Sequence, residues 1–214
     1  QRAARASAAF DDACTLYAIN VANAPMPGGG PSAALERVTG REDEVVALKG
    51  RLSDLIVAAR PDGDSHAVSM MTINAALFET GRPVMIAPPS FGVAGGTVGR
   101  KVAVSWNGSA EASRAVAAAM PLITRSESVV VLTADSDKTS SHVASDLAAY
   151  FAWHGVEAQT RALSASGGQV GAALLGECDA MGADLLVMGA YTHSRMRQLI
   201  LGGVTRHILS EAQI

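Results

Sequence analysis

The sequence predicts an α/β fold built on parallel sheets that are flanked by helices. Three observations support this prediction: strand-like and helix-like segments alternate along the chain, several strand-like segments are apolar throughout, and the second half repeats the pattern of the first. Alternation of this kind is typical of parallel sheets with helices on both faces and right-handed crossovers. Continuous apolar runs are typical of strands that are buried on both faces.

The second half of the chain alternates four strands with four helices. The apolar run SVVVLTAD at residues 128–135 indicates a strand buried on both faces, and Gly155 and Gly182 stand where helices would end. Ser109 is a candidate N-cap for the first helix. The predicted strands are residues 101–106, 128–135, 156–163 and 184–190, and the predicted helices are residues 110–126, 141–155, 167–183 and 202–212.

The first half repeats part of this order. A buried strand predicted at residues 14–21 corresponds to the strand at residues 128–135. Asp-Leu-Ile-Val at residues 54–57 corresponds to Asp-Leu-Leu-Val at residues 184–187. A helix at residues 65–81 and a strand at residues 82–89 follow, and the second half has no counterpart of that last strand. Each half is therefore predicted to be one copy of the same α/β unit.

The two copies differ in length. The first is shorter where the second has its helix at 141–155, because residues 24–35, APMPGGGPSAAL, are too rich in Pro and Gly to form a long helix. Either that helix is deleted or part of the natural chain lies outside this sequence. We expect an incomplete first domain at residues 1–90, a glycine-rich linker around residues 90–100, and a second domain at residues 101–214 that lacks its last strand.

The composition narrows the class of protein. A net charge of −3 and a pI near 5.9 argue against a general nucleic-acid binder, which would carry a basic face. No apolar run is long enough to span a membrane. Cys14 and Cys178 lack the spacing of a metal site or a redox pair, so we expect two reduced, buried thiols and a cytoplasmic protein.

The turn between the last predicted strand and the last helix is a candidate anion site. Ligands of parallel α/β sheets lie beyond the carboxyl ends of the strands, where the strand order reverses. Gly189 ends the strand, and Gly202 and Gly203 open the helix. The free backbone N–H groups of a helix N-terminus favour phosphate. The same stretch contains three arginines, and no acid lies between Asp184 and Glu211. Glycines at a strand end and a helix start also occur as ordinary turn residues, so that alternative stays open.

The stretch DLLVMGAYTHSRMRQLILGGVTRHIL resembles the C-terminal signature of the universal stress protein family, and VAVSWNGSAEASRAV resembles that family's first strand and helix. The resemblance covers nearly all of the second half and, more weakly, DLIVAARPDGD and GRPVMIAPP of the first half. It implies two tandem adenine-nucleotide-alpha-hydrolase-like (Rossmann-like) domains, each with a parallel sheet of about five strands. The two domains would pair as an intramolecular pseudo-dimer, and further pairing of two chains stays open.

The resemblance also implies a site for ATP or a related adenine nucleotide, with or without Mg²⁺. The family's spacing carries over to Gly189, Thr192 and Gly202, and the phosphate-binding set implied for this chain is completed by Gly203, Val204 and Thr205. Asn107 and the strand end from Val131 to Thr133 would border the adenosine.

Three residues depart from the pattern of the nucleotide-binding members. Thr192 replaces a glycine, Gly203 replaces a serine or threonine, and Asn107 stands where an aspartate is frequent. The equivalent turn of the first copy, AARPDGD, contains Pro61 and two acids that would repel phosphate, so that copy is predicted to be degenerate and structural.

Three functions follow as alternatives. The first is a cytoplasmic stress-response protein that binds an adenine nucleotide and acts as a sensor or scaffold. The second is a ligand-free interaction module with the same fold, which the exchanges at Thr192 and Gly203 favour. The third is a slow ATP hydrolase, against which stands the lack of any recognisable catalytic constellation in the sequence.

Overall fold

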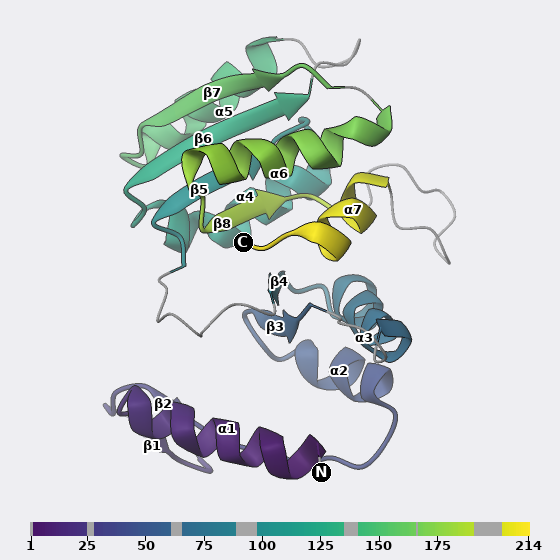
Figure 1. Cartoon of the computed structure of the whole chain (residues 1–214). Coiled ribbons are helices and arrows are strands. Elements are labelled where there is room, and N and C mark those ends of the chain that lie inside the picture. Colours follow the sequence, from purple (N-terminus) through teal and green to yellow (C-terminus); the bar gives the residue numbers. More distant parts are fainter. Residues whose placement is uncertain are drawn as a thin grey trace.

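The computed structural model describes residues 2–24, 28–60, 66–88, 98–134, 141–165, 167–190 and 203–214. The predicted α/β class is confirmed: every strand pair found among these residues is parallel, and helices accompany the sheets (Figure 1). Two regions, residues 2–88 and residues 98–214, differ in how much sheet they contain.

Residues 98–214 contain a four-stranded parallel sheet among the described residues, with the strand order β7-β6-β5-β8. The predicted strands and helices of this region are found close to their predicted positions. Their bounds are β5 Lys101–Ser105, α4 Ala110–Ile123, β6 Ser128–Ala134, α5 Ser141–Trp153, β7 Ala158–Leu163, the 3-10 helix η2 Gly167–Gln169, α6 Val170–Met181, β8 Leu185–Met188 and α7 Gly203–Glu211. The chain therefore leaves β5 on one side through β6 and β7, and returns to its other side with β8.

Helices cover both faces of this sheet (Figure 1), and each face has its own hydrophobic core. Alternate residues of β5 and β6 point to opposite faces: Val104 and Val131 pack with α4 and α5, whereas Ala103 and Leu132 pack on the face of α6 and α7. Both faces are covered, and β6 is buried from Val129 to Thr133, as its apolar run predicted.

The region at residues 2–88 is built differently. Its described elements are α1 Arg2–Leu16, β1 Asn20–Val21, β2 Ser32–Ala33, α2 Glu42–Gly50, β3 Ile56–Ala59, α3 His66–Glu79 and β4 Val84–Ala87. The strands predicted around residues 54–57 and 82–89 and the helix at 65–81 are present as β3, β4 and α3. The expected sheet of about five strands is not found among the described residues, where β1 pairs with β2 and β3 with β4 in two separate sheets.

The strand predicted at residues 14–21 is wrong. Helix α1 continues through Leu16, and its end is marked by Ala18, whose φ of 51° lies in the left-handed region. Only Asn20 and Val21 then form a strand, and both are exposed. An apolar run becomes a buried strand only where neighbouring strands and helices cover it, and here the alanine-rich helix before it extends into the run instead.

The remaining sequence expectations concern the thiols and the membrane. Cys14 and Cys178 are both free and buried, as predicted. Burial, followed by the nearby Asp179 and Glu177 carboxylates, raises the pKa of the Cys178 thiol to about 12. Among the described residues, no helix combines the length and the apolar character needed to cross a membrane.

Candidate functional site at the carboxyl edge of the four-stranded sheet

In the order β7-β6-β5-β8 the chain moves outward from β5 through β6 to β7 and then crosses to the other side of β5 for β8, so the strand order reverses at β5, next to β8. The carboxyl ends of all four strands lie at one edge, because the strands are parallel. In such sheets a crevice for ligands opens beyond this edge at the reversal. The segments that follow β5, β6 and β8 are therefore the candidates for lining a ligand site.

The loop after β5 is held by three local interactions. The Trp106 backbone N–H donates to the Leu132 carbonyl at 2.9 Å, and its indole Nε1–H donates to the Val143 carbonyl at 3.0 Å. The Ser109 backbone N–H donates to Asn107 Oδ1 at 3.1 Å. These bonds tie the loop to β6 and to the first turn of α5. Asn107 thus orders its own turn through its side-chain oxygen.

Helix α4 begins at this edge, and side chains of the protein already interact with its N-terminal end. Ser109 is the N-cap, as predicted, and its Oγ accepts from the Ala112 N–H at 3.2 Å. The pKa of the Glu111 carboxyl is lowered, first by a hydrogen bond from its own backbone N–H and further by the Arg114 guanidinium. An anion from the chain itself therefore occupies the positive end of α4.

Gly189 brings the end of β8 against the same helix. A Cβ at this position would lie 2.5 Å from the Ala112 backbone nitrogen and 2.8 Å from the Glu111 carbonyl carbon. The space beside its Cα is therefore filled by α4 rather than open to a ligand. The glycine is needed for close packing of β8 on α4, which differs from the open approach that the sequence alone suggested.

Helix α7 lies at the same edge because it packs on the first turn of α6. A Cβ at Gly171 would lie 2.8 Å from His207 Cδ2, so the two helices approach closely there. The first turn of α6 follows the carboxyl end of β7 through η2. Figure 1 shows α7 below α6, at the side of β8.

The first turn of α7 is open and carries no acid. Residues 203–206 are Gly, Val, Thr and Arg. Gly203 is exposed, and no described residue lies within 4 Å of the place where a Cβ would stand. Val204 packs its side chain on the core, and Thr205 is buried. Only the backbone N–H groups of these two residues can therefore face a ligand at this end of the helix.

The other predicted site residues divide into two groups. Val131 lies in the middle of β6 with no exposed surface, so its side chain belongs to the core, and Thr133 is a buried residue near the end of that strand. Thr192 and Gly202 lie outside the described residues. The sequence did not indicate that Trp106 and Gly108 help to shape this loop. The signal for Gly108 was the glycine of the WNGS turn, whose φ of 70° is one that glycine adopts readily.

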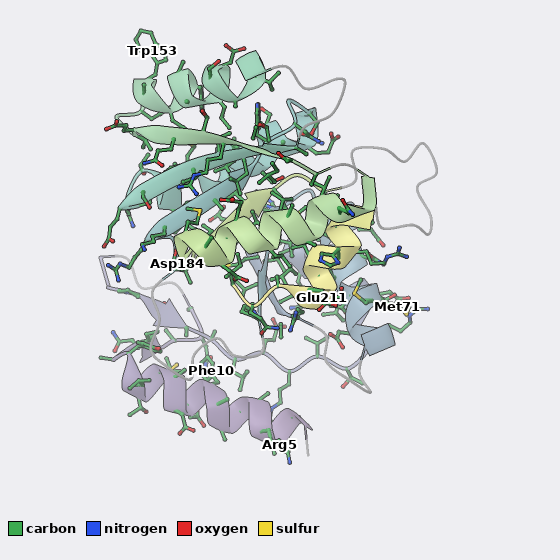
Figure 2. All side chains as sticks on the ribbon, turned by 45° about the horizontal axis from the view of Figure 1, so that its top comes forward. Arg5, Phe10, Met71, Trp153, Asp184 and Glu211 are labelled. Carbon is green, nitrogen blue, oxygen red and sulfur yellow. The ribbon has the colours of Figure 1, made fainter. Side chains whose placement is uncertain are left out.

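At the opposite edge, Asp184 ties the start of the sheet together (Figure 2). Its Oδ1 accepts from the backbone N–H groups of Gly99 at 3.1 Å and Lys101 at 2.9 Å, and its Oδ2 accepts from the Arg100 N–H at 3.0 Å. This aspartate therefore fixes where β5 begins beside β8. It positions the strands and lies away from the candidate site.

The comparison with solved structures bears on the fold. A universal stress protein from Archaeoglobus fulgidus superposes with a TM-score of 0.62 over 85% of this chain, at 16% sequence identity. The chain has the fold of a universal stress protein structure. The match spans 65% of the length of the Archaeoglobus protein. At this identity, the likeness concerns the fold and not the ligand.

A second solved structure, protein Rv1636 from Mycobacterium tuberculosis, gives 23% identity over 44% of this chain and 75% of its own, with a TM-score of 0.35. That score is too low to support an inference. No protein-family model and no curated protein sequence matches the chain.

Proposed function

We propose that residues 98–214 bind ATP or a related adenine nucleotide at the carboxyl edge of the four-stranded sheet. The single observation that carries this proposal is the open, acid-free first turn of α7 at the edge where the strand order reverses at β5. The universal-stress-protein fold supports it, and the protein would act as a cytoplasmic stress-response sensor or scaffold.

The contrast between the two helix N-termini indicates which of them would hold phosphate. Helix α4 has its N-cap Ser109 and the Glu111 carboxylate at its positive end. Helix α7 has neither an acid in its first turn nor a side chain at Gly203. Its N–H groups have no partner within the helix, and Arg206 adds positive charge. A phosphate would therefore be attracted to α7 and repelled by Glu111 at α4.

In the proposed complex the phosphates lie on the backbone of α7 and of the turn before it. The N–H groups of Gly203, Val204 and Thr205 would donate to phosphate oxygens. Gly189, Thr192 and Gly202 complete the set that the family resemblance implies. The loop at Asn107 and the end of β6 at Thr133 would border the adenosine, whereas Val131 would contribute through its backbone alone. A Mg²⁺ ion would arrive with the nucleotide.

The scaffold part of the proposal rests on the surface of the first region. Large apolar side chains are exposed there, whereas among the described part of residues 98–214 only Tyr150 and Trp153 are exposed large apolar residues. Exposed apolar surface is typical of protein contact sites. In the proposed arrangement this region contacts the second one or another chain. Its exposed apolar residues are Leu16, Tyr17, Val21, Leu35, Val38, Leu48, Leu52, Leu55, Val57, Met71 and Phe78.

Gly203 offers a sharp test of nucleotide binding. A Cβ added here meets none of the described residues, and a glutamate in the first turn of a helix interacts favourably with the helix dipole. Gly203→Glu should therefore fold at least as stably as the wild type, yet repel the phosphates. Gly203→Gln is the matched control, because it adds the same bulk without the charge.

The measurement is calorimetric titration with ATP, together with analysis of adenine nucleotide released when the purified wild type is denatured. We expect wild type and Gly203→Gln to bind ATP, and Gly203→Glu to bind at least about tenfold more weakly, as two like charges at close range require. If the wild type releases no nucleotide and gives no heat with ATP, the proposal fails and the ligand-free interaction module replaces it. Phosphate release that depends on the same site would instead support the slow hydrolase.

A further inference from the structure

Arg60 connects the first region to helix α7. It follows β3 directly, and its backbone N–H donates to the Ala87 carbonyl at 2.8 Å, which extends the pairing of β3 with β4. Its Nη1 donates to the Ser210 carbonyl at 2.8 Å. The residue is therefore fixed by its backbone in the sheet of the first region, while its guanidinium bonds a helix that lies 150 positions further along the chain.

The end of α7 lacks a positive charge of its own. The last four carbonyls of a helix have no partner within the helix, and this end carries a partial negative charge. The last turn of α7 contains no basic residue, and it contains Glu211, whose charge has the unfavourable sign there (Figure 2). The cation that complements this end is Arg60 of the other region.

The environment of Arg60 favours this one arrangement. The side chain is partly buried, and its Nε is buried with no hydrogen-bond partner among the described residues. The bond from Nη1 to the Ser210 carbonyl lies at the surface, and it is charge-assisted, which makes it stronger than a bond between two neutral groups. The enclosed Nε restricts the side chain, so that Nη1 stays directed at the Ser210 carbonyl.

We propose that Arg60 is a positioning residue that anchors the C-terminal end of α7 to the β3–β4 sheet. Through this anchor the first region regulates the nucleotide site, because the opposite end of the same nine-residue helix carries Gly203, Val204 and Thr205. The regulatory part rests on the proposed function. The anchor itself rests only on the contact between Arg60 and Ser210.

The anchor is tested by hydrogen exchange on the full chain without nucleotide. Arg60→Met removes the charge and the donors but keeps a linear apolar stem. The amides of residues 207–212 should exchange about three- to tenfold faster, as expected for the loss of one charge-assisted hydrogen bond at a helix end, while those of β5 and β6 stay unchanged. Arg60→Lys, which keeps the charge, should restore most of the protection.

Arg82→Met is the matched control. Arg82 Nε and Nη2 donate to the Arg51 carbonyl at 3.1 and 2.8 Å, and Arg51 is the C-cap of α2. This variant loses the same chemistry at a helix end within the first region, so it should speed exchange in α2 and leave α7 unchanged. Unchanged exchange of α7 in Arg60→Met, or an equal change in Arg82→Met, would overturn the anchor.

The regulatory part is tested by titrating Arg60→Met with ATP. We expect an affinity about two- to fivefold below that of the wild type, since weakening one end of a short helix loosens the other, and an unchanged affinity in Arg82→Met. Equal affinity in the wild type and Arg60→Met overturns the regulation. If the wild type binds no ATP at all, the proposed function fails and the regulation with it, whereas the exchange of α7 still decides whether Arg60 is an anchor.

Discussion

Two strands with nearly the same sequence have different fates in the two regions of this protein. The segment Asp-Leu-Ile-Val leads into β3, where Val57 is 63% exposed, and Asp-Leu-Leu-Val leads into β8, where the corresponding Val187 is 7% exposed. Strand β8 pairs with β5 and is covered by α4, whereas β3 pairs with β4 alone among the described residues. Burial is therefore supplied by the neighbours of a strand and not by its own sequence.

The aspartates in front of these strands differ in the same way. Asp184 accepts three backbone N–H groups from the segment that begins β5. Asp54 is exposed, and no hydrogen bond joins it to another described residue. The comparison indicates that residues 98–214 carry most of the packing free energy, while residues 2–88 are held by fewer buried contacts.

A buried and an exposed phenylalanine should give the greatest contrast. Phe151 of α5 has no exposed surface and packs in the core between this helix and the sheet, whereas Phe78 of α3 is 52% exposed. Phe151→Ala should lower the free energy of unfolding by about 3–5 kcal/mol, and Phe78→Ala by less than about 1 kcal/mol. Guanidinium unfolding followed by circular dichroism measures both. Similar losses would show that the two regions are packed alike.

The paired aspartates should differ by a smaller amount. In Asp184→Asn one of the two oxygens that accept N–H groups becomes an amide nitrogen, which cannot accept. We expect a loss of about 1.5–3 kcal/mol, against less than about 0.5 kcal/mol for Asp54→Asn. Urea unfolding of both variants checks this. An equally large loss in Asp54→Asn would mean that Asp54 stabilises the start of β3 as Asp184 stabilises the start of β5.

Much of the second region could be predicted from its sequence, because each local signal there agrees with the packing. The apolar run of β6, the N-cap Ser109 and the left-handed Gly182 after α6 all stand where the elements require them. The prediction of a strand at residues 14–21 failed because α1 extends through Leu16, and the short β1 that follows pairs only with the equally short β2 among the described residues. Nor could local patterns reveal Gly189 against Ala112 or Arg60 at Ser210, since these contacts join residues that are far apart in the sequence.

The two glycines of the candidate site should respond differently to alanine. A methyl group at Gly189 meets the backbone of α4 at 2.5 Å, and a backbone cannot give way as a flexible side chain does. Gly189→Ala should lower the free energy of unfolding by about 1–3 kcal/mol. The methyl group of Gly203→Ala meets none of the described residues. The free energy of unfolding, measured by thermal melting, should therefore change by less than about 0.5 kcal/mol in either direction. A destabilised Gly203→Ala would mean that the start of α7 is packed.

Exposed ion pairs should show the least difference between the regions. Arg100 donates to both carboxylate oxygens of Glu127, at 2.8 and 2.9 Å, and Arg41 donates to both carboxylate oxygens of Asp43. In each pair the hydrogen bond from the arginine is the main cause that lowers the pKa of the acid. A lowered carboxyl pKa stabilises the fold above the unfolded pKa, and this stabilisation is lost as the pH falls through the folded value.

Glu127→Gln and Asp43→Asn should therefore both melt slightly below the wild type at pH 7, by similar small amounts, because both pairs are screened by water. In melting curves recorded over a series of pH values, the difference from the wild type should start to shrink as the pH falls past the ordinary carboxyl pKa of about 4. It should vanish only below the lowered pKa values of Glu127 and Asp43 in the folded protein. A clearly larger effect at Glu127 would mean that charge, and not only burial, distinguishes the two regions.

Photolabelling with an azido derivative of ATP tests most directly whether the nucleotide site belongs to the second region. The full chain is irradiated with the probe in the presence and absence of excess ATP, and the labelled peptides are identified by mass spectrometry. We predict labelling that ATP suppresses in peptides containing Asn107 or Thr133, and no such labelling in residues 2–88. Suppressible label in the first region, or label that ATP does not suppress anywhere, would contradict a nucleotide site at the carboxyl edge of the four-stranded sheet.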